Sequence, residues 1–132
     1  MPASVLVVED DADAREMLLL VLADQGFIVT GAEDGRAALK LTESMRPGLI
    51  ITDLQMPNLN GIGLIKALRK RPEMKDVPIL IFSACPDGPL SDAMRAGANA
   101  AASKPLRLDS FIKLIKSLLP MVAFILLALF DA

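Results

Sequence analysis

Short apolar runs alternate with stretches of helical periodicity along the whole chain. The runs are rich in Val, Ile and Leu and end in polar or turn-forming residues, a pattern typical of strands buried on both faces of a parallel sheet. They predict five strands: Ser4–Val8, Phe27–Thr30, the stretch from Leu49 to Asp53, Val77–Phe82, and a weaker run from Ala98 to Ser103.

After each run, apolar residues recur three or four positions apart, as they do on the buried face of a helix. The first such stretch begins just after Asp11 and Asp13, and either of these can cap the helix N-terminus. The third stretch ends in four basic residues between 66 and 71, which we interpret as a solvated face favourable to the helix dipole. The predicted helices are Ala14–Gln25, a stretch from Ala37 to Met45, one from Gly61 to Arg71, Leu90–Ala96, and a last helix from about Leu108.

This alternation predicts an α/β fold, in which a five-stranded parallel sheet is covered by helices on both faces through right-handed crossovers. The chain has 132 residues, of which 53% are hydrophobic, and this suits one domain with a packed core. We assign the domain to residues 1–119 and regard residues 120–132 as an apolar C-terminal extension.

Composition narrows the classes of function. The chain contains no His, which excludes His metal ligands, His general bases and a phospho-His of its own. Its formal net charge of -2 gives no reason to expect nucleic-acid binding. The single cysteine, Cys85, cannot form an internal disulfide, and Met1–Ser4 lacks the basic region of a signal peptide. We therefore expect a protein of the reducing cytoplasm.

Polar residues follow four of the five predicted strands: Glu9 and Asp10, Asp53, Ser83, and Lys104. Because the carboxyl ends of parallel strands share one edge of a sheet, we expect these side chains to meet. Carboxylates that crowd together repel one another unless a cation is present, and an oxygen-only cluster suits Mg²⁺. A lysine and a hydroxyl could hold the oxygens of a phosphoryl group, and a carboxylate could accept it.

Each of these residues also has a plainer structural interpretation. Asp53 could cap a turn, Ser83 could bond to local backbone, and Lys104 could be a solvated surface lysine. Asp11 and Asp13 are better explained as helix caps than as metal ligands. Only the convergence of several such residues on one edge favours a functional site.

The same residues occur in a recognisable order: Glu9-Asp10, Asp53 with Met56-Pro57 and Gly61 beyond it, Ser83-Ala84, and Lys104-Pro105. With this set, residues 4–119 resemble the receiver domain of bacterial two-component response regulators. The resemblance implies a flavodoxin-like, doubly wound (βα)5 fold. It also implies a stand-alone switch that is controlled by phosphorylation.

A magnesium site follows from the resemblance. Asp10 would bind Mg²⁺ directly, and Glu9 would bind it directly or through water. Asp53 and the backbone carbonyl of Gln55 would supply the remaining protein ligands.

The resemblance also implies phosphoryl chemistry at Asp53, which would accept the group from a phospho-His of a sensor histidine kinase or a histidine phosphotransfer protein. Ser83 and Lys104 would each bind a phosphoryl oxygen. The Lys104–Pro105 bond is similar to one that the family holds cis. The protein would not be a conventional enzyme, since it would catalyse at most its own phosphorylation and slow dephosphorylation.

Three features depart from the family pattern. The aromatic residue usually found three positions before the lysine is replaced by Ala101, so the aromatic half of the usual switch is missing. The loop from Cys85 to Pro89 is slightly shorter than is typical. The tail from Leu118 to Phe130 carries no charge, and as a helix it is too short to cross a bilayer, so we expect no membrane span. We expect a homodimer, formed through this tail or through the face of the predicted helix Leu90–Ala96.

Two other functions stay open. A pseudo-receiver would dimerise or bind partners without phosphorylation, and Ala101 and the tail favour it, whereas the intact acids oppose it. A phosphatase of the haloacid-dehalogenase kind would use Asp11 and Asp13 after the first strand. That alternative leaves Asp53 without a role and provides no cap for a substrate.

Overall fold

The computed structural model describes residues 3–83, 88–104 and 107–118. In chain order the elements of this part are β1 (Ser4–Val8), α1 (Ala12–Asp24), β2 (Ile28–Ala32), α2 (Gly35–Leu41), β3 (Leu49–Asp53), α3 (Gly61–Arg69), a 3-10 turn (Pro72–Met74), β4 (Ile79–Ser83), α4 (Gly88–Ala96), β5 (Ala100–Ser103) and α5 (Leu108–Leu118).

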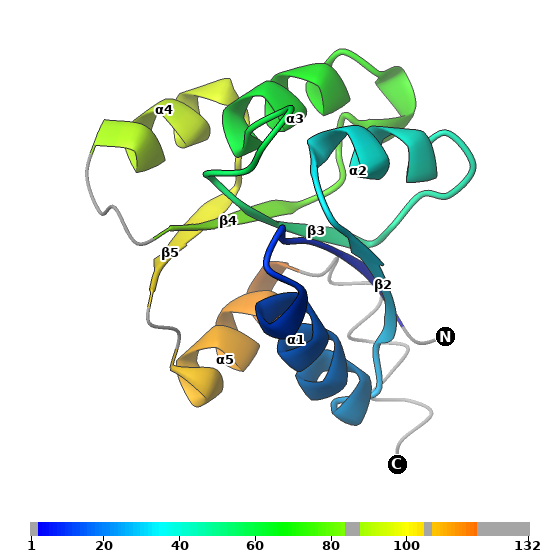
Figure 1. The fold of residues 1–132 in the computed structure, drawn as a ribbon, viewed down its shortest axis with the longest axis vertical. Coiled ribbons are helices and arrows are strands. Elements are labelled where there is room, and N and C mark those ends of the chain that lie inside the picture. The colour runs from blue at the N-terminus through cyan, green and yellow to red at the C-terminus, as the bar shows by residue number, and fades with distance from the viewer. Residues whose placement is uncertain (1–2, 84–87, 105–106, 119–132) are drawn as a thin grey trace.

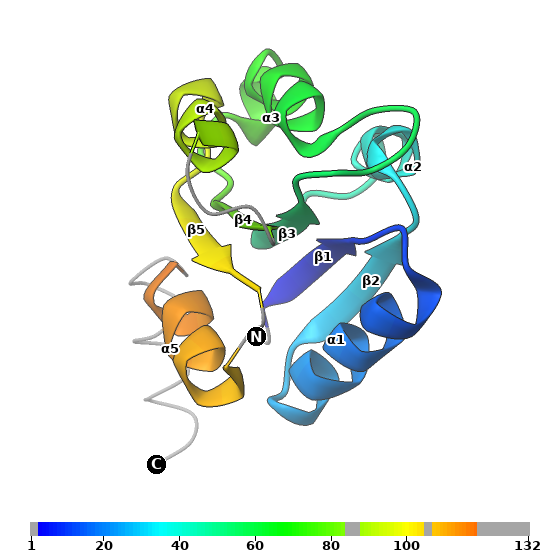
Figure 2. The same cartoon turned by 60° about the vertical axis from the view of Figure 1, so that its left-hand side comes forward.

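The strands form one parallel sheet in the order β2-β1-β3-β4-β5. Figures 1 and 2 show α1 and α5 on one face of the sheet and α2, α3 and α4 on the other. The predicted flavodoxin-like (βα)5 fold is therefore confirmed.

The predicted elements are present, but several of their ends differ. β2 runs on to Ala32 because β1 continues to offer backbone partners, and the Glu9 N–H donates to the Ala32 carbonyl at 3.0 Å. α2 ends at Leu41, and the Thr42 hydroxyl turns back to donate to the Ala38 carbonyl at 2.9 Å. α1 starts at Ala12 and is capped by Asp11, one of the two caps that the sequence indicated.

The side chains of the sheet separate into two buried clusters because successive residues of a strand point to opposite faces. Residues on the α2, α3 and α4 face include Leu6, Val8, Ile50, Ile79 and Ile81. Residues on the α1 and α5 face include Val5, Val7, Leu49, Ile51, Leu80 and Phe82, with Phe111 and Ile115 from α5 packed against them. This alternation also decides which polar side chains share a face at the carboxyl edge of the sheet.

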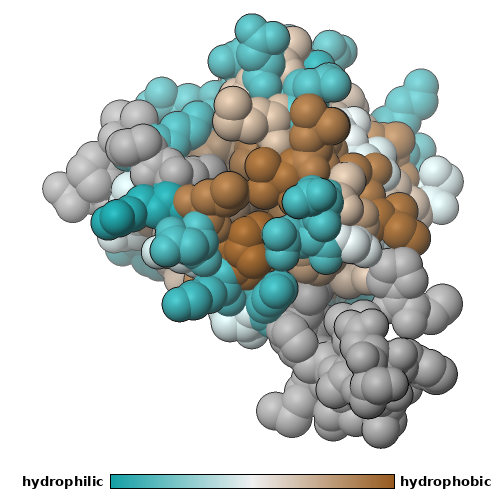
Figure 3. All heavy atoms as spheres, turned by 90° about the horizontal axis from the view of Figure 1, so that it is seen from below, coloured by the Kyte–Doolittle hydropathy of each residue, from teal (hydrophilic) through white to brown (hydrophobic). Residues whose placement is uncertain are grey.

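Apolar side chains also lie on the outer surface of the α1 and α5 face. On α1, Met17 is 67% and Leu20 is 64% exposed, and Ile28 at the start of β2 is 56% exposed. Figure 3 looks onto this face from below and shows apolar side chains gathered at its centre with polar ones around them. α1 is therefore apolar on its outer side as well as on its packed side.

Some expectations concern parts of the chain outside the described residues. These are the loop around Cys85, the Lys104–Pro105 peptide bond and the apolar tail beyond Leu118. Among the described residues, no helix combines the length and the apolar character that crossing a membrane requires.

Arg69 corrects the interpretation of the basic end of α3 as a solvated face. Its guanidinium is half-buried and donates to the carbonyl oxygens of Met74 and Val77, both at 2.8 Å. It also donates to the Gly97 carbonyl at 2.9 Å and to Asn99 Oδ1 at 2.9 Å. Arg69 thus ties the end of α3 to the segments that lead into β4 and β5, because its rigid fork of donors reaches several carbonyls at once.

The substitution Arg69→Met should lower the free energy of unfolding by about 2–4 kcal/mol, because it leaves several half-buried carbonyls without a charged donor. Lys70→Met is the matched control, since Lys70 is the exposed neighbour at the same helix end. Urea unfolding followed by circular dichroism measures the free energy of unfolding of both variants. Equal losses in the two would show that the carbonyl contacts of Arg69 do not stabilise the fold.

Candidate acidic site at the carboxyl edge of the sheet

The predicted site residues meet where the strands end. Glu9 and Asp10 follow β1, Asp53 is the last residue of β3, and Lys104 follows β5. Carboxylate oxygens of Glu9, Asp10 and Asp53 all lie within 4.8 Å of one another. Glu9 and Asp53 are buried, at 2% and 7% exposed, whereas Asp10 is exposed to solvent.

The backbone around Glu9 is fixed by its neighbours. Arg15, one turn into α1, donates to the Glu9 carbonyl at 2.8 Å. The Asp11 N–H donates to Glu9 Oε1 at 3.2 Å, and the Asp11 side chain caps α1. Asp11 and Asp13 are both exposed, and the Asp11 side chain is the cap, whereas Asp13 contributes only the backbone N–H that Asp11 accepts. The start of α1 therefore holds the turn that directs Glu9 and Asp10 into the site.

Lys104 provides the positive charge of the site. Its ammonium nitrogen lies 2.9 Å from Asp53 Oδ2 and 3.8 Å from Glu9 Oε2. Burial alone would lower the pKa of Lys104. The hydrogen bond to Asp53 and the negative charges of Asp53, Glu9 and Asp10 outweigh that effect, so the pKa rises. The ammonium therefore stays charged at neutral pH and offsets part of the repulsion between the carboxylates.

Glu9 is the least favourably placed carboxylate. Burial and then the negative charge of Asp53 raise its pKa to about 7, although the Asp11 N–H and Lys104 act in the opposite direction. Within the described residues its Oε2 atom is buried and accepts no hydrogen bond. A buried oxygen without a donor is costly. A cation bound between the carboxylates would satisfy it.

The β3–α3 loop folds back tightly over Asp53. The Gly61 N–H donates to the Leu54 carbonyl at 2.9 Å, and a Cβ at position 61 would lie 2.5 Å from the Asp53 carbonyl oxygen. Only glycine allows this approach. The Gln55 N–H donates to Asp53 Oδ1 at 3.3 Å, so each oxygen of the Asp53 carboxylate is held, one by backbone and one by Lys104.

Ser83 ends β4 beside the site and is 2% exposed. Its carbonyl accepts the backbone N–H of Lys104 at 2.9 Å, which links the end of β4 to the lysine. Ala101 lies on β5 opposite Ile81, and its side chain is exposed. The position that usually carries an aromatic residue therefore presents only a methyl group.

Phe82 also belongs to the site, although the sequence alone does not indicate it. Its ring lies beneath the Lys104 ammonium, 4.9 Å from the nitrogen to the ring centroid. The alternation of side chains along β4 could have placed this ring on the face shared with Asp53. Composition gave no such signal, because a phenylalanine in an apolar strand looks like any other core residue.

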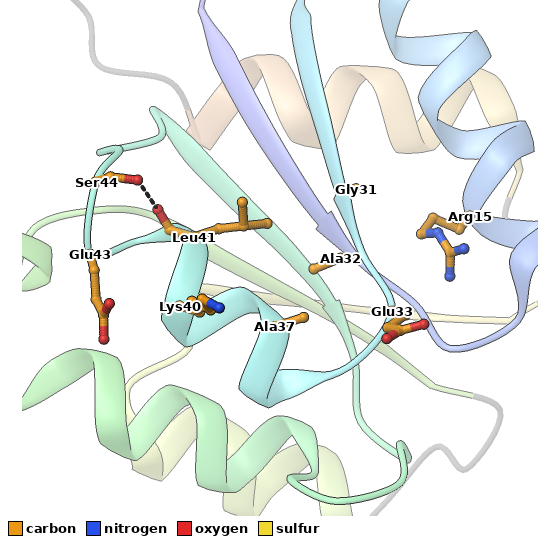
Figure 4. A pocket seen from close by; sticks show the side chains of 9 residues that line it. All are labelled: Arg15, Gly31, Ala32, Glu33, Ala37, Lys40, Leu41, Glu43 and Ser44. Carbon is orange, nitrogen blue, oxygen red and sulfur yellow. Dashed lines mark hydrogen bonds between the residues drawn. The ribbon is translucent and has the colours of Figure 1, made fainter.

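A hollow of about 700 Å³ lies beside the edge strand β2 (Figure 4). The charged side chains around it, Glu33, Lys40 and Glu43, are exposed and of both signs. Arg15 also lines it, but its guanidinium is bonded to the Glu9 carbonyl. The lining of this hollow therefore combines both signs of charge, unlike the acidic cluster, where three carboxylates converge.

Comparison with known proteins agrees with this geometry. The family model described as the response regulator receiver domain matches residues 5–116. The chain belongs to this family.

As a receiver, it is similar to the polar-differentiation response regulator DivK of Brucella anthropi, with 31% identity over 90% of this chain and 98% of DivK. It is 37% identical to the response regulator MprA of Mycolicibacterium vanbaalenii over 90% of this chain, and the matched part is 51% of MprA. Among solved structures, the chemotaxis protein CheY4 of Vibrio cholerae matches with a TM-score of 0.85 and 31% identity over 90% of this chain and 100% of CheY4.

Phosphorylation and Mg²⁺ binding are general properties of receiver domains. The residues of this receiver fit a magnesium ion. The donor set consists of carboxylate oxygens, which is the ligand type that Mg²⁺ prefers, and one of them is a buried oxygen that accepts no hydrogen bond in the described structure. The individual ligand roles of Glu9, Asp10, Asp53 and the Gln55 carbonyl stay predictions.

The raised pKa of Glu9 predicts how stability depends on pH. Folding takes up a proton at Glu9 between its ordinary pKa of 4.5 and about 7, so its contribution to stability falls as pH rises through this range. With Mg²⁺ removed, Glu9→Gln should raise the free energy of unfolding at pH 8 by up to about 3 kcal/mol and change it little at pH 5. Thermal unfolding followed by circular dichroism at both pH values tests this.

Glu16→Gln on the exposed side of α1 serves as the matched control and should show no such difference. A Glu9→Gln protein that is equally stabilised at both pH values would show that the effect is not the titration of Glu9.

Proposed function

We propose that this receiver is a phosphorylation-controlled switch of a two-component phosphorelay, with Asp53 as the phosphoryl acceptor and Mg²⁺ as the cofactor. The observation that carries the proposal is the placement of the Asp53 carboxylate between Lys104, at 2.9 Å, and the acidic pair Glu9 and Asp10. A nucleophilic carboxylate next to a fixed ammonium and a cation site suits phosphoryl transfer better than any other chemistry of these residues.

In this proposal an Asp53 carboxylate oxygen attacks the phosphorus atom. The bond from phosphorus to the donor nitrogen breaks, and its electron pair leaves with the donor. The Lys104 ammonium, which is bonded to the Asp53 carboxylate beforehand, then donates a hydrogen bond to a phosphoryl oxygen. The Ser83 hydroxyl donates a hydrogen bond to another phosphoryl oxygen. Bound at Glu9, Asp10, Asp53 and the Gln55 carbonyl, Mg²⁺ would neutralise charge on the transferring group. The residues of the chain otherwise act by holding the reacting groups in position. Positioning alone can account for much of the rate enhancement of a phosphoryl transfer.

The donor in this proposal is a phospho-His of a sensor histidine kinase or of a histidine phosphotransfer protein, because the chain has no His of its own. We place the protein in the cytoplasm, where its single Cys stays reduced. The pseudo-receiver is retained as a second candidate because the exposed Ala101 lacks the aromatic ring of the usual switch.

Incubation with acetyl phosphate and Mg²⁺ should add one phosphoryl group to the intact protein, as measured by mass spectrometry. Asp53→Asn should abolish the addition and keep the fold, since the amide is not a nucleophile and has nearly the same shape. Asp24→Asn, at the far end of α1, is the control and should be phosphorylated normally. Uptake that persists in Asp53→Asn would rule out Asp53 as the acceptor. No uptake in the unaltered protein would favour the pseudo-receiver.

We also propose a homodimer, formed through residues 120–130 or through α4, on which Met94 is 42% exposed. The supporting observation for the tail is its apolar, uncharged sequence, which is unfavourable in water. Light scattering should show a dimer that becomes a monomer in Phe124→Asp/Leu127→Asp. Dissociation in Met94→Asp instead would assign the contact to α4. A monomeric unaltered protein would remove the dimer from the proposal.

A further inference from the structure

Lys104 reaches Asp53 by crossing over a neighbouring strand. Asp53 ends β3 and Lys104 follows β5, and β4 lies between them in the sheet. Adjacent strands are about 4.8 Å apart, so the backbones of β3 and β5 are separated by roughly twice that distance. The Lys104 and Asp53 side chains close this gap together, and their charged ends meet at 2.9 Å. The β4 residue at this level is Phe82, which is in register with Asp53 on one side and with Ala102 on the other.

The Phe82 ring forms the surface over which the lysine passes. Phe82 belongs to the buried cluster on the α1 and α5 face and is 1% exposed. The Lys104 nitrogen lies 4.9 Å from the centre of the ring, within the range in which a cation is attracted by an aromatic face. Ala102, next to Phe82 on β5, has only a methyl side chain and packs against the same buried cluster.

We propose that Phe82 is a positioning residue for Lys104 and that its ring holds the ammonium against the Asp53 carboxylate. This inference rests on the proposed phosphoryl transfer for its effect on rate, but the contact itself does not depend on it. An aromatic face attracts the ammonium without accepting a particular N–H. The N–H groups that do not bond to Asp53 thus stay available for the oxygens of an incoming phosphoryl group.

The ring also explains how the flexible Lys104 side chain is held in place. A lysine side chain has several rotatable bonds, and fixing them costs conformational entropy. A rigid, buried ring beneath the ammonium restricts it without adding another charge to an already crowded site. Leucine at position 82 would fill similar space but would offer no negative ring face.

The test compares Phe82→Leu with Phe111→Leu. Phe111 is the matched control because it lies in the same buried cluster and is 3% exposed, but it comes from α5. Nuclear magnetic resonance is measured on the whole chain without phosphodonor. In the unaltered protein, the chemical shift of the Lys104 ε-methylene protons should be displaced by the ring. That shift should be lost in Phe82→Leu and kept in Phe111→Leu.

The same variants are then timed for phosphoryl uptake from acetyl phosphate by intact mass. Phe82→Leu should slow the maximal rate about three- to tenfold at saturating Mg²⁺, while Phe111→Leu should leave it unchanged. Fluorinated phenylalanines placed at position 82 keep the shape of the ring but weaken its negative face. They should slow uptake progressively, and they provide the test if Phe82→Leu does not fold.

An unchanged Lys104 resonance in Phe82→Leu would overturn the proposal. So would equal slowing by Phe82→Leu and Phe111→Leu, or a rate that does not respond to fluorination. If the unaltered protein takes up no phosphoryl group, the proposed function fails. The resonance measurement then still decides whether the Phe82 ring lies against Lys104.

Discussion

The site depends on one electrostatic constraint, namely the burial of the Glu9 and Asp53 carboxylates beside each other at the edge of the sheet. Such a pair is unfavourable in a poorly solvated place unless positive charge lies within a few ångströms. Lys104 supplies that charge at 2.9 Å from Asp53 and 3.8 Å from Glu9. Much of the local structure serves this arrangement: Arg15 holds the Glu9 carbonyl, and Gly61 lets the β3–α3 loop close over Asp53.

The sequence was sufficient to predict the fold and the neighbourhood of the site because both follow from local patterns. Apolar runs such as Leu49–Asp53 marked buried parallel strands, and the carboxyl ends of such strands share one edge. The sequence therefore predicts that Glu9, Asp10, Asp53 and Lys104 lie together, and in the structure they do. Element ends were less predictable, since β2 extends to Ala32 only because β1 offers it a backbone partner.

The side chains that the sequence did not reveal act through long-range contacts. Arg69 looked like one of several basic residues at a helix end, but its role is set by carbonyls of Met74, Val77 and Gly97, which the fold brings to it. Phe82 looked like a core residue, and only the register of three strands shows that it lies beneath the path of Lys104. Periodicity predicts which face a residue occupies, but not which partner meets it there.

The charges of the site also indicate why a divalent cation and a phosphoryl group would bind together. With all groups ionised, Glu9, Asp10, Asp53 and Lys104 carry a net charge of two negative units. A phosphoryl group would add negative charge beside carboxylates that already repel one another. Mg²⁺ would balance the resident charge, and Lys104 could then turn from Asp53 towards the new oxygens. Ala101 offers no ring to follow such a movement, so in the proposed switch a change at Lys104 and at the strand end of Ser83 would carry the signal.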